Sequence, residues 1–143
     1  MFKRDSDTEY LLGSKQPNTL PTKPFDSLVC EFLEIFSKKL NLMKNIKKHP
    51  DLKTLSFWCR KGNIYNLKKK YFSEETRMGL GMIFHITPSN IPTNFAYSLI
   101  FGLLTGNSNI VKVPSKKFDE IDIICSVINL ILTFNSFNSS IIF

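Results

Sequence analysis

The chain has 143 residues, which is enough for one ordinary domain with a single buried core. Its apolar share of 43% and its mean hydropathy of -0.06 are typical of a globular chain rather than a disordered one. No segment reaches the roughly 18 consecutive apolar residues that a membrane helix requires. The first ten residues lack an apolar run and place acids directly after two basic residues, so we predict no secretory signal and a cytoplasmic location.

The charge distribution leaves several classes of partner open. The net charge is +7, and all 19 basic residues lie at or before Lys117. A basic surface of this kind can attract nucleic acid, a phosphorylated cofactor or an anionic thioester such as coenzyme A. The runs Lys47-Lys48 and Lys68 to Lys70 are too short to distinguish a solvated surface from an anion site.

The three cysteines predict free thiols. Cys30, Cys59 and Cys125 are far apart and form no CxxC pair, which argues against both a disulfide framework and a zinc site. Cys125 lies within an apolar helical pattern, where a thiol is usually buried and inert. Cys59 lies beside Arg60, whose positive charge can lower the pKa of a thiol.

We divide the chain into four segments. Residues 1–24 are polar and are punctuated by Gly13, Pro17, Pro21 and Pro24, which indicates a flexible leader. Residues 25–78 are a helical N-terminal segment, and residues 79–134 are a partial cofactor-binding α/β unit. Residues 135–143 are expected to be a frayed C-terminal end.

Apolar residues at helical spacing predict the first helix, which Asp26 or Ser27 can cap. The residues expected on its buried face are Phe25, Leu28, Val29, Phe32, Leu33, Phe36 and Leu40. A second helix is expected to begin at Pro50 and to end at Gly62. A third, short helix is expected around residues 64–70.

The next segment alternates between strand and helix. Residues 81–86 form a short apolar run, which predicts a strand buried on both faces of a parallel sheet. A polar turn over 87–90 leads to a helix over 92–106, and residues 109–113 form the next strand, parallel to the first. The last helix, over 118–134, is apolar around nearly its whole circumference and is expected to be buried on several sides.

This order predicts an α/β fold in which N-terminal helices precede an incomplete parallel Rossmann-like sheet unit. Two strands are fewer than the four to six of a typical open sheet. The chain also closes with Asn and Ser followed by three apolar residues. We therefore interpret it as an N-terminal fragment; the alternative is a small complete domain whose last residues dock as an edge strand.

Candidate functional residues gather after the first strand, where open α/β sheets bind their ligands. Asn90 can direct its amide at a developing oxyanion, or it can instead cap the following helix or close an Asx turn. Lys112 can meet a cofactor phosphate or ribose, or it can be a solvated lysine at the end of a strand. His85 is better explained as a satisfied core histidine than as a base.

Two runs of the sequence resemble the acyl-CoA reductase family of bacterial luminescence systems, a branch of the aldehyde dehydrogenase superfamily. These are HITPSNIPTNFAYSLIFGLLTGNSNIVKVPSK and FWCRKGNI. The superfamily shows Pro-Trp-Asn-x-Pro, a helix ending in Gly-Asn and a strand carrying Lys. Here these motifs are Pro88-Ser89-Asn90-Ile91-Pro92, Gly106-Asn107 and Lys112. The resemblance is most specific between Gly79 and Lys116.

The resemblance implies a chemistry and a set of site residues. In that family an acyl group passes from a thioester to a cysteine thiolate, and hydride from NADPH then reduces the enzyme-bound thioester to an aldehyde. Asn90 would be the oxyanion donor, and Lys112 would hold the adenosine ribose or its phosphate. The residues expected on the nicotinamide side of the cofactor are Ile86, Thr87, Pro88 and Ser89.

The resemblance also implies a cofactor preference. Ser115 falls where many NAD-preferring relatives carry a glutamate that binds the ribose hydroxyls. A neutral Ser beside Lys116 and Lys117 would instead tolerate a 2′-phosphate, so NADPH is the expected cofactor. Ser89 departs from the Trp of the superfamily, as expected for the reductase branch.

The nucleophilic cysteine of the family lies far downstream of the Asn motif, beyond Phe143, so the fragment by itself is expected to be inactive. The expected partner is a fatty acyl-CoA or an acyl-protein donor, with no nucleic acid, and the full-length parent is expected to be a homo-oligomer. Two rival interpretations are a non-catalytic module that binds through the basic surface of residues 44–48 and 68–70, and a nonfunctional gene remnant that folds poorly.

Overall fold

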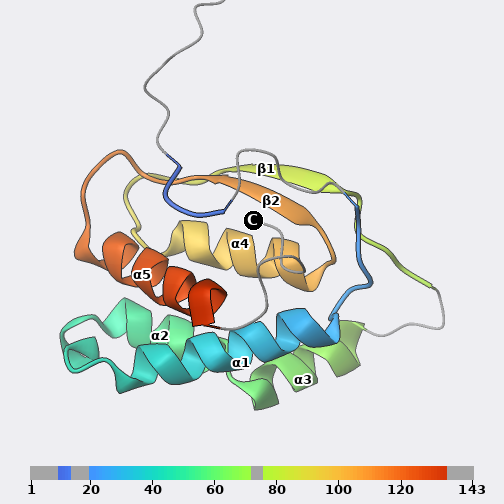
Figure 1. Ribbon diagram of the computed structural model, residues 1–143, viewed down its shortest axis with the longest axis horizontal. Helices are drawn as coiled ribbons and strands as arrows, with labels where there is room; N and C mark the ends of the chain where they lie inside the picture. Colours follow the sequence, from blue (N-terminus) through green and yellow to red (C-terminus); the bar gives the residue numbers. More distant parts are fainter. Residues whose placement is uncertain (1–9, 14–19, 72–75, 135–143) are drawn as a thin grey trace, which may run out of the picture.

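The computed structural model describes residues 10–13, 20–71 and 76–134. Along the chain its elements are α1 (Ser27–Leu42), the 3-10 helix η1 (Ile46–Lys48), α2 (Pro50–Trp58), α3 (Lys61–Tyr71), β1 (Met82–Ile86), α4 (Asn94–Leu104), β2 (Ser108–Lys112) and α5 (Asp119–Phe134). The sheet forms one layer, α4 and α5 lie beneath it, and α1, α2 and α3 form the far layer (Figure 1). This arrangement confirms the predicted α/β class.

The first helix forms as its pattern predicts. The carboxylate of Asp26 caps α1 by accepting a hydrogen bond of 2.9 Å from the backbone N–H of Leu28. Leu28 itself is exposed, but the rest of the predicted face is buried, namely Phe25, Val29, Phe32, Leu33, Phe36 and Leu40. This face packs against α2, α3, α4 and α5, so α1 links the far layer to the middle one.

The prediction that Gly62 ends the second helix is wrong. Helix α2 already ends at Trp58, where the N–H of Cys59 bonds to the carbonyl of Leu55, and Gly62 is the second residue of α3. Apart from its chain neighbours and the backbone of its own helix, no described atom lies within 4 Å of the position that a Cβ on Gly62 would take. A glycine at such an open position costs a helix only about 1 kcal/mol, which does not stop it. The third helix is consequently longer than the predicted 64–70.

The two strands pair in parallel, as predicted, in a register that aligns Met82 with Ser108 and Ile86 with Lys112. The expectation that the first strand is buried on both faces is wrong. Met82, Phe84 and Ile86 are 42%, 59% and 76% exposed, whereas Ile83 and His85 alternate with them and are half-buried. The exposure of side chains alternates along β1 because α4 contacts one face of the sheet. Within the described residues, no second helical layer covers the other face of the sheet.

The two helices of the middle layer differ from their predictions at their edges. Helix α4 begins at Asn94 rather than at Pro92, which lies in the preceding turn, and its predicted apolar face is buried throughout. In α5 the buried residues are Ile121, Ile124, Cys125, Val127, Ile128, Ile131 and Leu132. Leu130 and Phe134 are exposed, so α5 is buried along one broad side and not around its circumference.

A three-way backbone contact joins the end of α4 to the start of the sheet. Gly106 follows α4 with a φ of 83°, and its carbonyl accepts a hydrogen bond of 2.9 Å from Thr22. The carbonyl of Thr22 in turn accepts one of 3.1 Å from Gly79. The approach is so close that a Cβ on Gly79 would overlap the carbonyl of Gly106, and a Cβ on Gly106 would overlap that of Thr22.

Some expectations lie outside the described residues. These are the frayed end or edge strand at 135–143 and most of the leader, and the four-segment division of the chain stays a prediction. In the part of the chain that the structure describes, no helix is both long and apolar enough to cross a bilayer.

Candidate functional site

The carboxyl ends of β1 and β2 meet at one edge of the sheet. Ile86 and Lys112 are register partners at the last position of each strand. One residue further, the hydroxyl of Thr87 donates a hydrogen bond of 3.1 Å to the carbonyl of Lys112. Two of the predicted cofactor residues are thus joined directly, at the edge where parallel sheets bind ligands.

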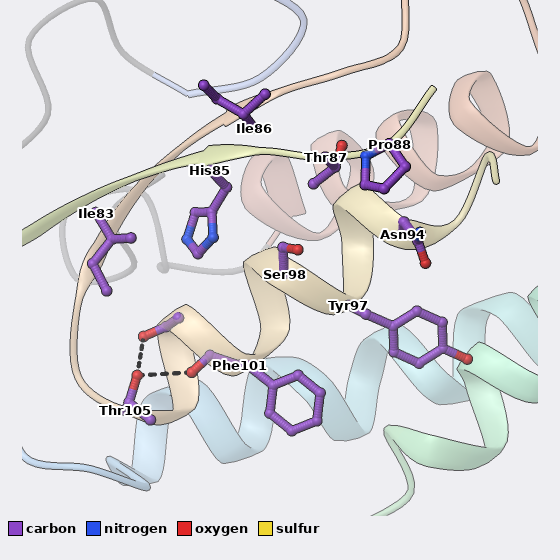
Figure 2. A pocket seen from close by; sticks show the side chains of 11 residues that line it. Ile83, His85, Ile86, Thr87, Pro88, Asn94, Tyr97, Ser98, Phe101 and Thr105 are labelled. Carbon is purple, nitrogen blue, oxygen red and sulfur yellow. Dashed lines mark hydrogen bonds between the residues drawn. The ribbon is translucent and has the colours of Figure 1, made fainter. Parts of the chain in front are cut away.

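A pocket of about 580 Å³ lies between β1 and α4 (Figure 2). Its wall on the β1 side is formed by Ile83, His85, Ile86, Thr87 and Pro88, and its wall on the α4 side by Asn94, Tyr97, Ser98, Phe101, Gly102 and Thr105. Three of the predicted cofactor residues therefore line it. Among the described residues the lining includes no Asp, Glu, Lys or Arg, so the pocket suits an uncharged group that combines apolar surface with hydrogen-bonding atoms.

Asn90 lies outside this lining and is exposed in the bend that follows β1. The residue at the N-cap of α4 is Thr93, so the alternative that Asn90 caps this helix is wrong. No side chain or backbone group in the described ranges hydrogen-bonds to the Asn90 amide. The alternative that Asn90 closes an Asx turn is therefore wrong as well. Its role as an oxyanion donor stays a prediction, and its N–H groups are available for it.

The remaining predicted cofactor residues do not line the pocket. Ser89, Lys112 and Ser115 are exposed, and so are Lys116 and Lys117. The Nζ of Lys116 lies 5.1 Å from the centre of the Phe118 ring, which orients the ammonium group at the exit of β2. Cationic side chains thus follow the carboxyl end of β2, and these donors fit a phosphorylated ligand.

His85 and Asn109 form a polar pair between the sheet and α4 that the sequence analysis only half anticipated. Nε2 of His85 lies 2.9 Å from Oδ1 of Asn109, so one ring nitrogen has a partner, but the ring is half-buried and lines the pocket rather than lying in the core as predicted. Asn109 was not predicted. The feature of the sequence that could have indicated it is Gly102, a glycine inside an apolar helix. A Cβ at Gly102 would overlap the Asn109 amide oxygen, so the glycine makes room for this side chain.

No cysteine lines the pocket, and all three are free thiols, as predicted. The suggestion that Arg60 lowers the pKa of Cys59 is wrong, because burial raises that pKa to about 12. The Arg60 guanidinium lies instead over the Phe57 ring, 4.9 Å from its centre. Burial, with the charge of Asp122 adding to it, raises the pKa of Cys125 to about 11, and burial also raises the pKa of Cys30.

The basic runs are accounted for by local structure. Lys47 and Lys48 lie in the last turn of η1, and residues 68–70 end α3, where cations interact favourably with the helix dipole. The Nζ of Lys69 lies over the Tyr65 ring of the same helix, 4.7 Å from its centre. Within the described ranges no three His, Cys, Asp or Glu side chains are grouped so that they could hold a metal ion.

Fold and site together define an α/β protein in which two parallel strands and their connecting helix frame a ligand pocket beside a lysine-bearing strand end. The family model for acyl-CoA reductase (LuxC) matches residues 33–128, from within α1 to within α5. The chain therefore belongs to the acyl-CoA reductase (LuxC) family, which confirms the resemblance. No curated protein and no solved structure matches it.

Proposed function

We propose that this chain supplies the oxyanion donor and part of the cofactor site of an NADPH-dependent reductase that converts fatty acyl-CoA, or an acyl-protein thioester, to fatty aldehyde. The family match over residues 33–128 carries the proposal, since it supports the reduction of fatty acyl-CoA in general. The finer assignments depend on the placement of Asn90, Lys112 and the strand-end turn. We also propose a cytoplasmic, homo-oligomeric parent protein.

The turn after β1 and the exit of β2 would hold the cofactor. Thr87 and Pro88 line the pocket and would face the nicotinamide side together with Ile86 and Ser89. Lys112 would meet the adenosine ribose or its phosphate. When bound, NADPH supplies the hydride that reduces the thioester.

The residues after β2 favour NADPH over NADH. Ser115 is neutral and exposed, so it offers no carboxylate to repel a 2′-phosphate or to bind the ribose hydroxyls. Lys116 and Lys117 add two exposed positive charges beside it. Charge-assisted hydrogen bonds from lysine to phosphate are about twice as strong as neutral ones.

These two lysines provide a direct test of the cofactor. Titration of the chain with NADPH and NADH, followed by fluorescence of the reduced nicotinamide, should show tighter binding of NADPH. The double variant Lys116→Gln/Lys117→Gln should lower the NADPH affinity about tenfold, since two solvent-exposed ion pairs, each worth up to about 1 kcal/mol, are lost. It should change the NADH affinity much less.

The matched control is Lys47→Gln/Lys48→Gln, which removes the same charge from η1. If this control weakens NADPH binding as much as the double variant does, the effect comes from net charge and the assigned phosphate site is wrong. Equal affinity of the unmodified chain for NADH and NADPH would contradict the cofactor preference.

The acyl-accepting thiolate would come from another part of the parent protein. A thiol must ionise to attack a thioester, and burial raises the pKa of Cys30, Cys59 and Cys125. With values of about 12 for Cys59 and about 11 for Cys125, the thiolate fraction of these two at neutral pH is negligible.

The 143-residue chain should consequently neither oxidise NADPH with fatty acyl-CoA nor acquire an acyl group. Intact mass spectrometry after incubation with acyl-CoA checks the second point, and absorbance of NADPH checks the first. An acyl thioester on any of the three cysteines, formed while the chain is folded, would refute this part of the proposal.

A further inference from the structure

We propose that His85, oriented by Asn109, presents Nδ1 as a hydrogen-bond acceptor to an uncharged amide group bound in the pocket between β1 and α4. The amide chemistry follows from the pocket lining. Naming its two possible sources, the carboxamide of nicotinamide and the pantetheine arm of an acyl-CoA, rests on the proposed function. Nδ1 of His85 is a binding contact, and Asn109 is a positioning residue that acts through His85.

The hydrogen bonds of Asn109 determine which nitrogen of His85 carries the proton. Nδ2 of Asn109 donates a hydrogen bond of 2.7 Å to the carbonyl of Asn107. The opposite orientation of the amide would place two acceptor oxygens against each other, so Oδ1 must face His85. At 2.9 Å from this oxygen, Nε2 must be the donor, and in a neutral ring Nδ1 is then the acceptor.

The surrounding backbone holds Asn109 in this orientation. Its side chain is only 2% exposed and occupies the place of the missing Cβ of Gly102 in α4. The carbonyl that Asn109 binds belongs to Asn107, whose own Oδ1 accepts a hydrogen bond of 2.6 Å from the N–H of Leu80. A buried amide with both of its ends engaged is not free to flip, so the tautomer of His85 is determined by the fold.

Nδ1 is left without a partner at the wall of the pocket. No described group hydrogen-bonds to it, and no buried side-chain nitrogen or oxygen in the described part of the chain lacks a partner. Nδ1 is therefore reached by solvent, and His85 is one of the residues that line the pocket. In Figure 2 its ring extends from β1 toward α4.

The other polar side chains that line the pocket are Thr87, Asn94, Tyr97, Ser98 and Thr105. The hydroxyls of Thr87 and Thr105 already donate to the backbone carbonyls of Lys112 and Phe101. Ser98 lies on α4 below β1, in the space next to His85 in Figure 2, and its hydroxyl has no hydrogen bond to a described residue. A ligand amide can therefore donate its N–H to His85 and accept from Ser98, while a phosphate would find no cation in the lining.

NMR of the imidazole nitrogens in the folded chain tests the proposal. The chain has two histidines, and His49 is an internal reference because its Nδ1 lies 2.7 Å from the Glu120 carboxylate, away from the pocket. In its neutral form, His85 should show the Nε2–H tautomer. Nicotinamide is added in one titration and S-methylpantetheine in a second. At least one of the two probes should move the Nδ1 resonance of His85 without moving that of His49.

The probe that moves the resonance identifies the source of the amide. Inorganic phosphate should leave the resonance in place. A Nδ1–H tautomer for His85, a response to neither amide probe, or a response to phosphate would overturn the proposal.

Variants separate binding from a merely structural role. His85→Phe should weaken the affinity for the responding probe about five- to tenfold, because it removes one acceptor from the pocket, whereas His49→Phe should leave the affinity unchanged. Asn109→Leu should give a mixture of His85 tautomers while the fold, checked by circular dichroism, is retained. Equal losses for the two histidine variants would contradict the assignment. If the Asn109→Leu variant unfolds, the tautomer of His85 and its response to the probes in the unmodified chain still test the proposal.

Failure of this proposal and failure of the proposed function give different results. Failure of the amide site leaves the dependence of NADPH binding on Lys116 and Lys117 untouched. Conversely, a specific response of His85 together with no preference for NADPH would count against the cofactor proposal alone.

Discussion

Replacing Asn90 by alanine should lower kcat about 100-fold or more in the longest product of this gene that oxidises NADPH with fatty acyl-CoA, as does the removal of an oxyanion-hole donor elsewhere. The side chain is exposed beyond the end of β1, and its N–H groups have no competing partner among the described residues. It would therefore stabilise charge that develops only during acyl transfer. Because that contact is absent from the ground state, the KM for acyl-CoA should change within about threefold. Steady-state kinetics measure both quantities.

Asn129→Ala is the matched control, since Asn129 is exposed on α5 and the same atoms are removed. It should leave kcat and KM unchanged. A loss of less than about fivefold in kcat for Asn90→Ala would show that Asn90 is not the oxyanion donor. A large rise in KM with kcat unchanged would instead assign Asn90 to substrate binding.

Gly106→Ala should lower the free energy of unfolding of the chain by about 2–4 kcal/mol, from left-handed backbone strain and steric overlap together. The φ of Gly106 is 83°, a conformation that costs an L-residue about 1–2 kcal/mol. A Cβ there would also overlap the backbone carbonyl of Thr22. Because this carbonyl belongs to the backbone, it cannot move away by rotation of a side chain. Relief of that overlap would break the hydrogen bond between Thr22 and Gly106, and with it the attachment of Gly79. Urea denaturation followed by circular dichroism measures the change.

Gly62→Ala makes the same substitution where nothing lies within 4 Å of the new methyl group. In α3 it should raise the free energy of unfolding by up to about 1 kcal/mol, because alanine favours the helix. Opposite signs for the two variants are the expected result. If Gly106→Ala is neutral, the three-way contact of Thr22, Gly79 and Gly106 does not contribute to stability.

The helical N-terminal half was readable from its pattern because each signal there is local. Asp26 caps α1 within two residues of itself, and Pro50 begins α2 as a first-turn proline should. Gly62 misled the prediction of a helix end because the consequence of a glycine depends on what surrounds it. The order of strand, helix and strand in the second half was likewise evident from runs of apolar residues.

The candidate site was readable only in part. Its position at the ends of the strands could be predicted because a polar turn after a strand is a local feature. That Ile86, Thr87 and Pro88 face a ligand was implied only by the family resemblance; the structure places them in the pocket lining, and their contact with a cofactor stays a prediction. The pairing of His85 with Asn109 could not, because these residues are 24 positions apart and meet only through the register of the strands. The exposed face of Met82, Phe84 and Ile86 was hidden for a related reason, since an apolar run does not reveal which of its sides is covered.

The α/β class could be read from local periodicity, and the family and the candidate residues from short motifs and the resemblance that they carry. Which chemistry each of those residues has available depends on the folded molecule. Burial of Cys59 raises its pKa despite the neighbouring Arg60, and the absence of a cap role leaves the Asn90 amide available. For His85, the side-chain amide of Asn109 on the neighbouring strand determines which ring nitrogen carries the proton. Solvation, pKa and hydrogen-bond direction depend on atoms that are distant in sequence and become neighbours only when the chain folds.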